Sequence, residues 1–306
     1  MGRELGGVVG GGVGEVLGIP HTTYRPSPLR SEVMELNSGV AILTGAGGGI
    51  GSAMARRLAA EGMSLVLADR DADLLERTVE SLPDGISVSV VVGDVGIAKH
   101  HEQLLSAATS MGELKLSVLN AGMYLPGLCW EIPVEQWELQ MQVNFWGVLH
   151  GVRAAVPVMI EQGFGHVVAT ASGAGLVATP ALAPYVASKH AVVGLMESLH
   201  HELNRVAPAV HSSVICPGNI RTPMAANSRA AAGIETEHLL GEALAVAQSV
   251  RAGNDAGAHA DTVADALVEA VAENRFWVLP QPEVAWGALD RVQRIMDGRE
   301  PIDLIG

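Results

Sequence analysis

Short apolar runs alternate with longer stretches of helical periodicity along most of the chain. From residue 39 on, each run is rich in valine, leucine and isoleucine and leads into a loop, as buried strands do. The runs occupy residues 40–44, 64–70, 87–94, 114–122, 166–172 and 210–218. Helical patterns lie between them, at residues 52–62, 72–81, 97–111, 133–161 and 184–206. Strands that alternate with helices imply a parallel sheet, because parallel neighbours need crossover helices, which then cover both faces.

This alternation predicts one fold for nearly the whole chain: a single Rossmann-type, doubly wound parallel α/β sheet of about seven strands, with helices on both faces. We assign residues 37–283 to this domain and place a final helix and an edge strand within residues 261–280. The Ala-rich segment at about 223–260 also has a helical pattern. Residues 284–306 are expected to form a C-terminal tail. Residues 1–36 lack periodicity and predict a flexible N-terminal extension.

Composition excludes several classes of function. The 306 residues carry a formal net charge of −14 without any Lys/Arg-rich block, which argues against nucleic acid or an anionic membrane surface as a partner. No stretch reaches the roughly 18 consecutive apolar residues of a membrane span, and the N-terminus is a poor match to a signal peptide. The two cysteines, Cys129 and Cys216, are far apart and form no C-x-x-C, as expected in a reducing compartment. We therefore expect a cytoplasmic protein.

Histidines are numerous but give no metal site. Two pairs, His100–His101 and His200–His201, are adjacent in the sequence. Neighbours on a helix do not face the same point, and the second pair lacks the further histidine that a zinc helix would need. We expect packed or solvated histidines and no metal.

A glycine cluster follows the first apolar run. "TGAGGGIG", residues 44–51, places Gly45, Gly49 and Gly51 in the spacing T-G-x-x-x-G-x-G. Gly45 permits a sharp turn, Gly49 lets backbone N–H groups approach a pyrophosphate, and Gly51 allows close packing of helix on strand. The N-terminus of the next helix would point at the phosphates. Between a buried strand and an Ala-rich helix, this cluster predicts a dinucleotide site.

The loop after the second run bears on the choice of dinucleotide. Asp69 follows the glycines by about 20 residues, where a carboxylate accepts hydrogen bonds from the ribose hydroxyls of NAD and repels a 2′-phosphate. Arg70 could pair with that phosphate instead, although a solvated arginine is the simpler interpretation. Position 48, inside the turn, is glycine and not a basic residue. We therefore expect NAD to be preferred, with NADP possible.

"PYVASKHAVVG", residues 184–194, places Tyr185 and Lys189 one helical turn apart. Residues i and i+4 share a helix face, so the phenol and the ammonium would lie side by side. For a lone pair of this kind, a surface helix with a packed tyrosine and a solvated lysine is the simpler explanation. The other motifs of the chain decide between this explanation and a functional tyrosine–lysine pair.

Together these motifs make the chain similar to the short-chain dehydrogenase/reductase family, in the branch with T-G-x-x-x-G-x-G and Y-x-x-x-K, over roughly residues 39–280. Five further matches support the resemblance: Asp94 in "VGDVG", "LNAG" at 119–122, Asn144 in "MQVNFWGV", Ser172 in "TASGAG", and "PGNIRTPM" at 217–224. Leu119 replaces the first Asn of the family's N-N-A-G. That position is largely structural, and Asn120, Ala121 and Gly122 are kept.

The resemblance implies hydride transfer between a nicotinamide and an alcohol or carbonyl carbon. Tyr185 would be the general acid or base, with Lys189 favouring its phenolate and holding the nicotinamide ribose. Ser172 would hydrogen-bond the substrate oxygen. Asn144 would hold a water of a proton relay. The catalytic residues are thus expected to be Asn144, Ser172, Tyr185 and Lys189.

The resemblance also implies the cofactor contacts, in which Asp94 meets the adenine and Thr222 the nicotinamide amide. The expected cofactor-binding residues are Gly45, Gly49, Ile50, Gly51, Asp69, Arg70, Asp94, Val95, Asn120, Gly122, Tyr185, Lys189, Pro217, Gly218, Ile220 and Thr222.

The expected substrate pocket is largely apolar and suggests a fairly hydrophobic alcohol or ketone. Its walls would be residues 173–184, the segment after Thr222, and the residues after "NAG", namely Met123, Tyr124, Leu125 and Trp130. The segment at about 223–260 occupies the place of the family's mobile substrate lid, although a plain surface helical hairpin explains it nearly as well. Family members usually assemble through long helices, so we expect a homodimer or a homotetramer.

Two other classes of function are weighed against this one. A non-catalytic dinucleotide-binding sensor or scaffold would usually have lost the tyrosine or the lysine, and this chain keeps both. A related lyase or epimerase would normally carry T-G-x-x-G-x-x-G and a longer substrate domain, and neither is present.

Overall fold

The structure is a computed structural model that describes residues 34–234 and 239–302. The predicted extension, residues 1–36, therefore lies outside the described residues except for its last three. Of these, Leu36 is only 4% exposed and belongs to the core beside the sheet. The packed domain thus includes at least part of the segment just before the first strand.

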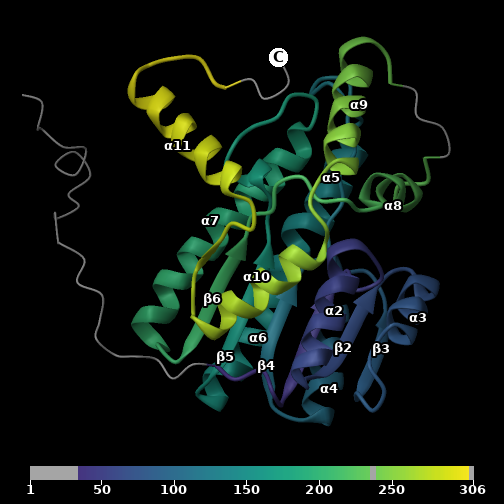
Figure 1. The fold of residues 1–306 in the computed structure, drawn as a ribbon, viewed down its shortest axis with the longest axis vertical. Coiled ribbons are helices and arrows are strands. Elements are labelled where there is room, and N and C mark those ends of the chain that lie inside the picture. The colour runs from purple at the N-terminus through teal and green to yellow at the C-terminus, as the bar shows by residue number, and fades with distance from the viewer. Residues whose placement is uncertain (1–33, 235–238, 303–306) are drawn as a thin grey trace, which may run out of the picture. The chain divides into compact units, whose positions relative to one another are not determined.

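Seven parallel strands form one sheet within the described residues, in the order β3-β2-β1-β4-β5-β6-β7. Figure 1 shows this sheet at the centre of the domain. The strands are β1 (Val40–Thr44), β2 (Ser64–Asp69), β3 (Val88–Val92), β4 (Leu114–Leu119), β5 (Gly165–Thr170), β6 (Val210–Ile215) and β7 (Trp277–Val278). This order confirms the predicted doubly wound α/β fold, and it reverses between β1 and β4.

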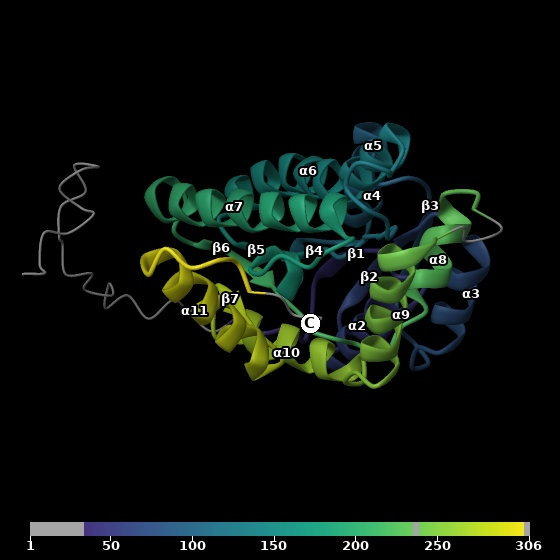
Figure 2. The same cartoon turned by 90° about the horizontal axis from the view of Figure 1, so that it is seen from above.

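Helices cover both faces of the sheet, as Figure 2 shows from above. On one face lie α4 (Ala98–Met111), α6 (Gly147–Gln162) and α7 (Ala183–Val206). The other face carries α2 (Gly49–Glu61), α3 (Ala72–Glu80) and α10 (Asp261–Ala272). The remaining helices, α5 (Val134–Met141), α8 (Met224–Ala231), α9 (Gly241–Asp255) and α11 (Pro282–Met296), lie around the carboxyl ends of the strands.

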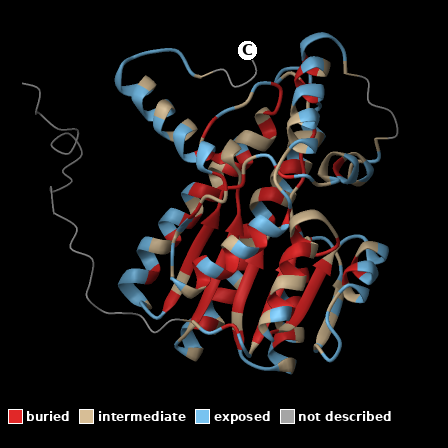
Figure 3. Cartoon of the chain, viewed as in Figure 1, coloured by how far each residue is buried: buried red, intermediate tan, exposed pale blue. Residues whose placement is uncertain are grey.

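The two faces arise from the alternation of side chains along each strand. In β1, Val40 and Ile42 belong to the core on the α4–α6–α7 face, and Ala41 and Leu43 to the core on the α2–α10 face. Because successive strand residues point to opposite faces, a strand buried on both sides is apolar throughout. Figure 3 shows the resulting buried sheet between partly exposed helices.

A π-helical segment, Gln142–Trp146, joins α5 to α6 within the long helical stretch predicted from the sequence. By length and composition, Val134–Gln162 is the one helix among the described residues that could cross a membrane. Its second half, α6, packs on β4 and β5, as the core helix of a globular domain does.

The C-terminal tail predicted for residues 284–306 contains most of α11, a helix that the sequence analysis did not assign. Its large apolar residues face outward: Trp286 is 68% exposed and Leu289 59%. The tail is therefore largely helical up to Met296.

Candidate active site

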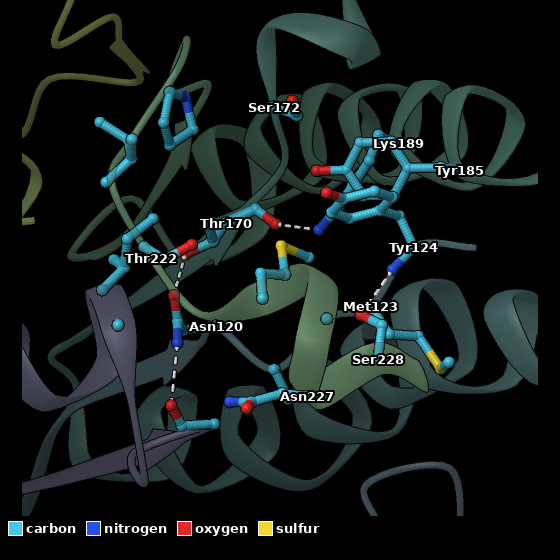
Figure 4. A pocket seen from close by; sticks show the side chains of 18 of the residues that line it. Asn120, Met123, Tyr124, Thr170, Ser172, Tyr185, Lys189, Thr222, Asn227 and Ser228 are labelled. Atoms are coloured by element: carbon cyan, nitrogen blue, oxygen red, sulfur yellow. Dashed lines mark hydrogen bonds between the residues drawn. The ribbon is translucent and has the colours of Figure 1, made fainter. Parts of the chain in front are cut away.

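A cavity of about 910 Å³ opens at the carboxyl ends of the central strands. It extends from the turn after β1, past the ends of β4, β5 and β6, to α8, α9 and α11. Ligands of open α/β sheets bind at this crevice, where the strand order reverses. Side chains from these distant segments converge there (Figure 4). All the expected cofactor residues except Gly51 line the cavity.

The glycine turn leaves room for phosphates at one end of the cavity. Gly45 and Gly49 have φ angles of +66° and +53°, which side-chain-bearing residues rarely adopt. A Cβ on Gly51 would lie 1.9 Å from the carbonyl oxygen of Gly45, so glycine is required where α2 packs against the end of β1. α2 begins at Gly49 without an acidic residue in its first turn, so its N–H groups present partial positive charge. This cradle fits the pyrophosphate of a dinucleotide.

The side chain of Asn120 connects three strand ends beside this turn. Its Nδ2 donates to the carbonyl oxygens of Thr44 at 3.2 Å and Gly45 at 3.3 Å. Its Oδ1 accepts from the hydroxyl of Thr170 at 3.1 Å. Asn120 therefore fixes the glycine turn to β4 and β5. The sequence analysis did not assign Thr170, although its position at the end of β5 places it here.

Asp69 and Arg70, at the end of β2, face the cavity with different partners. The Asp69 carboxylate accepts from the backbone N–H of Gly47 at 2.9 Å and of Asp71 at 3.2 Å. Arg70 Nη1 donates to the carbonyl oxygen of Ala231, the last residue of α8, at 3.1 Å. The carboxylate is thus held beside the glycine turn, while the guanidinium is directed to the C-terminus of a helix, where a cation is favoured.

Ser172, Tyr185 and Lys189 meet in the middle of the cavity (Figure 4). Tyr185 and Lys189 lie on the first turns of α7. The ammonium of Lys189 is 2% exposed, lies 5.7 Å from the centre of the Tyr185 ring, and donates to the carbonyl oxygen of Thr170 at 2.7 Å. Ser172 caps the short 3₁₀ turn Gly173–Gly175, where its hydroxyl accepts from the N–H of Ala174 at 3.1 Å, and it lines the cavity together with Tyr185.

Burial dominates the proton affinities of this group. It raises the pKa of Tyr185 to about 12, while the side-chain hydrogen bond with Ser172 acts in the opposite direction. Burial also lowers the pKa of Lys189 to about 8. The pKa of Tyr185 thus moves away from the neutral range, unlike the lowering expected from Lys189, because desolvation dominates and the opposing contribution comes from Ser172 and not from Lys189.

Asn144 is fully buried in the π-helical segment and does not line the cavity. Its Oδ1 accepts from the N–H of Met123 at 2.8 Å, and its Nδ2 donates to the carbonyl oxygen of Met123 and to the hydroxyl of Ser188, both at 2.9 Å. Both amide hydrogens are thus donated to protein atoms. The side chain fixes the loop after β4 against α7.

The substrate end of the cavity differs in part from the expected pocket. Met123 and Tyr124 line it, and the Tyr124 ring packs against Tyr185 with centroids 5.8 Å apart. Leu125 does not line it: the residue is buried, and its N–H donates to Gln140. Trp130 also does not line it, because its side chain is 80% exposed.

Other contributions come from segments that no motif marks. They include Asn227 and Ser228 on α8, Ser249 and Val250 on α9, and Glu283, Val284 and Gly287 on α11. The Ser228 hydroxyl accepts from the N–H of Tyr124 at 3.1 Å, which ties α8 to the loop after β4. The residues of α8 and α9 lie in the segment after Thr222 that the sequence analysis expected at the pocket, whereas those of α11 were not assigned to the site.

The family's missing asparagine has a steric explanation. Leu119 is buried at the end of β4, and a Cβ on Gly151 of α6 would lie 2.2 Å from Leu119 Cδ2. Leu119 therefore fills the space that a glycine leaves on the facing helix, which fits a structural position.

Metal-binding geometry is not found within residues 34–234 and 239–302, where no three His, Cys, Asp or Glu side chains come together. His100 and His101 are buried residues of α4, and Cys129 and Cys216 are free thiols.

A family model described as short chain dehydrogenase matches residues 39–233. The curated relative "CLA biosynthesis dehydrogenase/reductase" of Lactiplantibacillus plantarum is 33% identical over 270 residues, which are 86% of this chain and 94% of the relative. Sequence similarity therefore extends beyond the motifs to most of the chain.

Solved structures share the fold. A short chain dehydrogenase/reductase from Burkholderia phymatum in complex with NAD superposes with a TM-score of 0.84 at 36% identity, covering 89% of this chain and 99% of that one. A variant of actinorhodin polyketide ketoreductase with NADPH gives a TM-score of 0.67 at 29% identity, covering 80% and 96%. A nicotinamide dinucleotide is thus the supported class of cofactor, and neighbours of this fold carry either form.

Proposed function

Because the chain belongs to the short-chain dehydrogenase/reductase family, we propose that it is an NAD-dependent oxidoreductase of a fairly hydrophobic secondary alcohol or ketone. One observation carries this proposal. The side chains of Ser172, Tyr185 and the buried Lys189 line the same cavity, with Lys189 Nζ 5.7 Å from the centre of the Tyr185 ring. Hydride transfer to or from a carbonyl carbon needs such a proton-transferring group at the oxygen.

Tyr185 is assigned the proton transfer. With its pKa raised to about 12, the phenol is protonated at neutral pH and ready to act as the acid in ketone reduction. Alcohol oxidation needs the phenolate, which nearby positive charge favours. When bound, the nicotinamide would supply or accept the hydride and, in its oxidised form, would add positive charge beside the phenol.

Ser172 and Lys189 support this step. Ser172 holds the substrate oxygen and steadies its developing charge. Lys189 is anchored to Thr170 and is assigned to the nicotinamide ribose. Asn144 is assigned to the water of a proton relay. Because its amide hydrogens are donated to Met123 and Ser188, we assign that water to its backbone carbonyl oxygen.

NAD is the proposed dinucleotide, although NADP is not excluded. The Asp69 carboxylate lies beside Gly47 in the glycine turn, where the adenosine ribose is expected. Arg70 points its guanidinium at Ala231, which favours a role in holding α8 over one in binding a 2′-phosphate. The assigned cofactor contacts are those named from the sequence, with Gly51 acting through packing.

The proposed substrate is uncharged and largely apolar near the reacting carbon. Met123, Val177, Leu182 and Met224 line the same cavity as Tyr185. Such walls favour hydrophobic groups and disfavour a phosphorylated sugar.

The domain boundaries, the lid and the oligomeric state are proposed from the same family membership. We propose a dehydrogenase domain at residues 37–283, a lid formed by α8 and α9 within about 223–260, and a cytoplasmic homodimer or homotetramer. The lid interpretation is supported by α8 and α9, which both line the cavity.

The decisive experiment is a steady-state assay of the native chain with a panel of secondary alcohols and ketones and with both dinucleotides. The proposal expects turnover of apolar members and preference for NAD. A folded chain that binds a dinucleotide, measured by NADH fluorescence, but turns over no member would instead favour a sensor or scaffold.

A further inference from the structure

Helix α11 is held against the site through its first turn. Gln281, the residue before the helix, is 7% exposed and accepts a 2.8 Å hydrogen bond from the N–H of Gly218. Within α11, Val284 alone is buried, at 8% exposure. Leu289 and Val292, further along the helix, are 59% and 50% exposed. Figures 1 and 3 show the exposed remainder of the helix projecting from this end.

Val284 lies between two loops that face the reacting groups. A Cβ on Gly173, next to Ser172, would be 3.4 Å from Val284 Cγ2, and a Cβ on Gly218 would be 3.3 Å from the same atom. Val284 also lines the cavity. Its isopropyl group therefore closes the space between the serine loop and the Pro217–Gly218 loop.

The next turn of α11 continues this wall. Gly287 lines the cavity, and a Cβ there would lie 3.3 Å from Cγ2 of Val177, a residue that is 5% exposed. A side chain at position 287 would therefore press on the loop that carries Ser172. The first turns of α11 thus contribute Glu283, Val284 and Gly287 to the cavity wall, and Val284 is the buried residue among them.

Other segments line the far side of the cavity: Figures 1 and 2 show α8 and α9 on one side of the carboxyl ends of the strands and α11 on the other. Tyr124 and Met224 come from the loop after β4 and from α8, and Ser249 and Val250 come from α9. A carbon held at Ser172 and Tyr185 would thus direct one substituent toward α8 and α9 and the other toward α11. The two substituents meet walls of different chemistry and size.

We propose that Val284 sets the size of the substituent that the enzyme accepts on the α11 side of the reacting carbon. This inference rests on the proposed hydride transfer. The neighbours at 173 and 218 are glycines and have no side chains that could move into space vacated by a smaller residue. A larger residue would have to enter the cavity, because the same glycine backbones block the other direction.

The test compares native protein, Val284→Ala, Val284→Ile and Val292→Ala with aryl ketones whose second substituent is methyl, ethyl or propyl. We expect Val284→Ala to raise the ethyl-to-methyl ratio of kcat/KM at least about 10-fold, the lower end of what one methylene contributes in an apolar pocket. Val284→Ile should lower that ratio. Val292→Ala, exposed on the same helix, should keep the native ratio.

Binding provides a readout that does not depend on turnover. Quenching of tryptophan fluorescence by each ketone gives its affinity for the NAD-loaded protein, which has no hydride to transfer to a ketone, and the same size ranking is expected. Melting curves and the dissociation constant of NADH show that each variant is folded and loaded. If Val284→Ala does not fold, Val284→Ile still tests the proposal, because a larger side chain at this position should lower the ethyl-to-methyl ratio.

Unchanged ketone ranking in folded, NADH-binding variants at position 284 would overturn the assignment of Val284. Ketones that bind with the expected ranking but are never turned over would leave this wall in place and overturn the proposed reaction. Native protein that does not bind NADH would overturn both.

Discussion

The amine of Lys189 and the carbonyl oxygen of Thr170 are joined by a 2.7 Å hydrogen bond. The Thr170 hydroxyl in turn donates to Asn120, whose amide holds the carbonyl oxygens of the glycine turn. The buried cation is therefore anchored to the end of β5 and, through Asn120, to the phosphate end of the cavity. Its hydrogen-bonding partner is the backbone and not Tyr185, so the proposed effect of the ammonium on the phenol has to act through space.

Lys189→Met removes this cation while keeping a long apolar side chain. We expect dinucleotide affinity to fall about tenfold or more, the scale of a hydrogen bond to a charged group. The limb of the pH–rate profile for alcohol oxidation that reports Tyr185 should move to higher pH, because the phenolate loses a nearby positive charge. Fluorescence titration with NADH and a pH series of kcat measure the two effects. An unshifted limb would contradict the electrostatic role.

Tyr185→Phe removes one hydroxyl and keeps the ring that packs 5.8 Å from Tyr124. We expect a folded, NADH-binding protein whose turnover falls roughly 10²-fold or more, the usual scale for a general acid or base. Tyr124→Phe removes the other phenol of the cavity and should lose much less. Turnover, NADH affinity and melting temperature are measured on both variants. Near-native turnover of Tyr185→Phe would refute the catalytic assignment.

Asp69→Ser removes the carboxylate expected at the adenosine ribose. The preference for NAD over NADP, measured as a ratio of kcat/KM, should fall about tenfold or more, since a hydrogen bond to a charged group is lost along with repulsion of the 2′-phosphate. Arg70→Ala should keep the native preference, because the guanidinium is directed to Ala231. Equal or better turnover with NADP in the native protein would show that Arg70 governs this loop.

The sheet could be predicted because burial along β1 and β2 follows composition. Leu65 to Ala68 in β2 are fully buried, and this run is apolar throughout. A strand covered on both faces needs apolar residues at every position, and that requirement is local in the sequence. The same holds for the glycine turn, since the φ angles of Gly45 and Gly49 demand the residue type that marks it.

The cavity walls that come from distant segments of the chain could not be predicted from such local sequence patterns. The sequence of α11 is amphipathic, but its large apolar residues are exposed and only Val284 is buried, so its pattern does not indicate which residue reaches the cavity. Its contacts with Gly173 and Gly218 depend on how the chain returns after β7. Trp130 illustrates the converse, since an aromatic residue beside a motif proves to be 80% exposed.

A buried histidine in β5 predicts how stability depends on pH. His166 is 0% exposed, and its Nε2 lies 2.7 Å from the hydroxyl of Ser213. That hydroxyl donates its own hydrogen to the carbonyl oxygen of Arg275 at 2.7 Å, so it accepts from His166 and places the ring proton on Nε2. Nδ1 has no partner among the described residues. Burial lowers the pKa of His166 to about 3.

The sign of the effect follows from proton uptake. An unfolded histidine binds a proton near pH 6.5, whereas His166 in the folded protein does so only near pH 3. Between these two pKa values the unfolded chain binds more protons than the folded chain does. The contribution of His166 to the free energy of unfolding is therefore fully present above about pH 6.5 and is lost as the pH falls. His101, with a pKa lowered to about 4 by burial, acts in the same direction. The melting temperature should therefore fall between pH 7 and pH 5.

His166→Gln isolates the contribution of this ring. The glutamine amide can donate to Ser213 where Nε2 does, but it does not titrate. We expect a shallower fall in melting temperature on acidification than in the native protein, with part of the fall remaining because of His101. His201→Gln, at an exposed position of α7, should keep the native slope. His166→Gln removes the histidine whose proton affinity differs most between the folded and the unfolded chain. If its melting temperature fell with pH as steeply as that of the native protein, protonation of another group would drive the loss of stability.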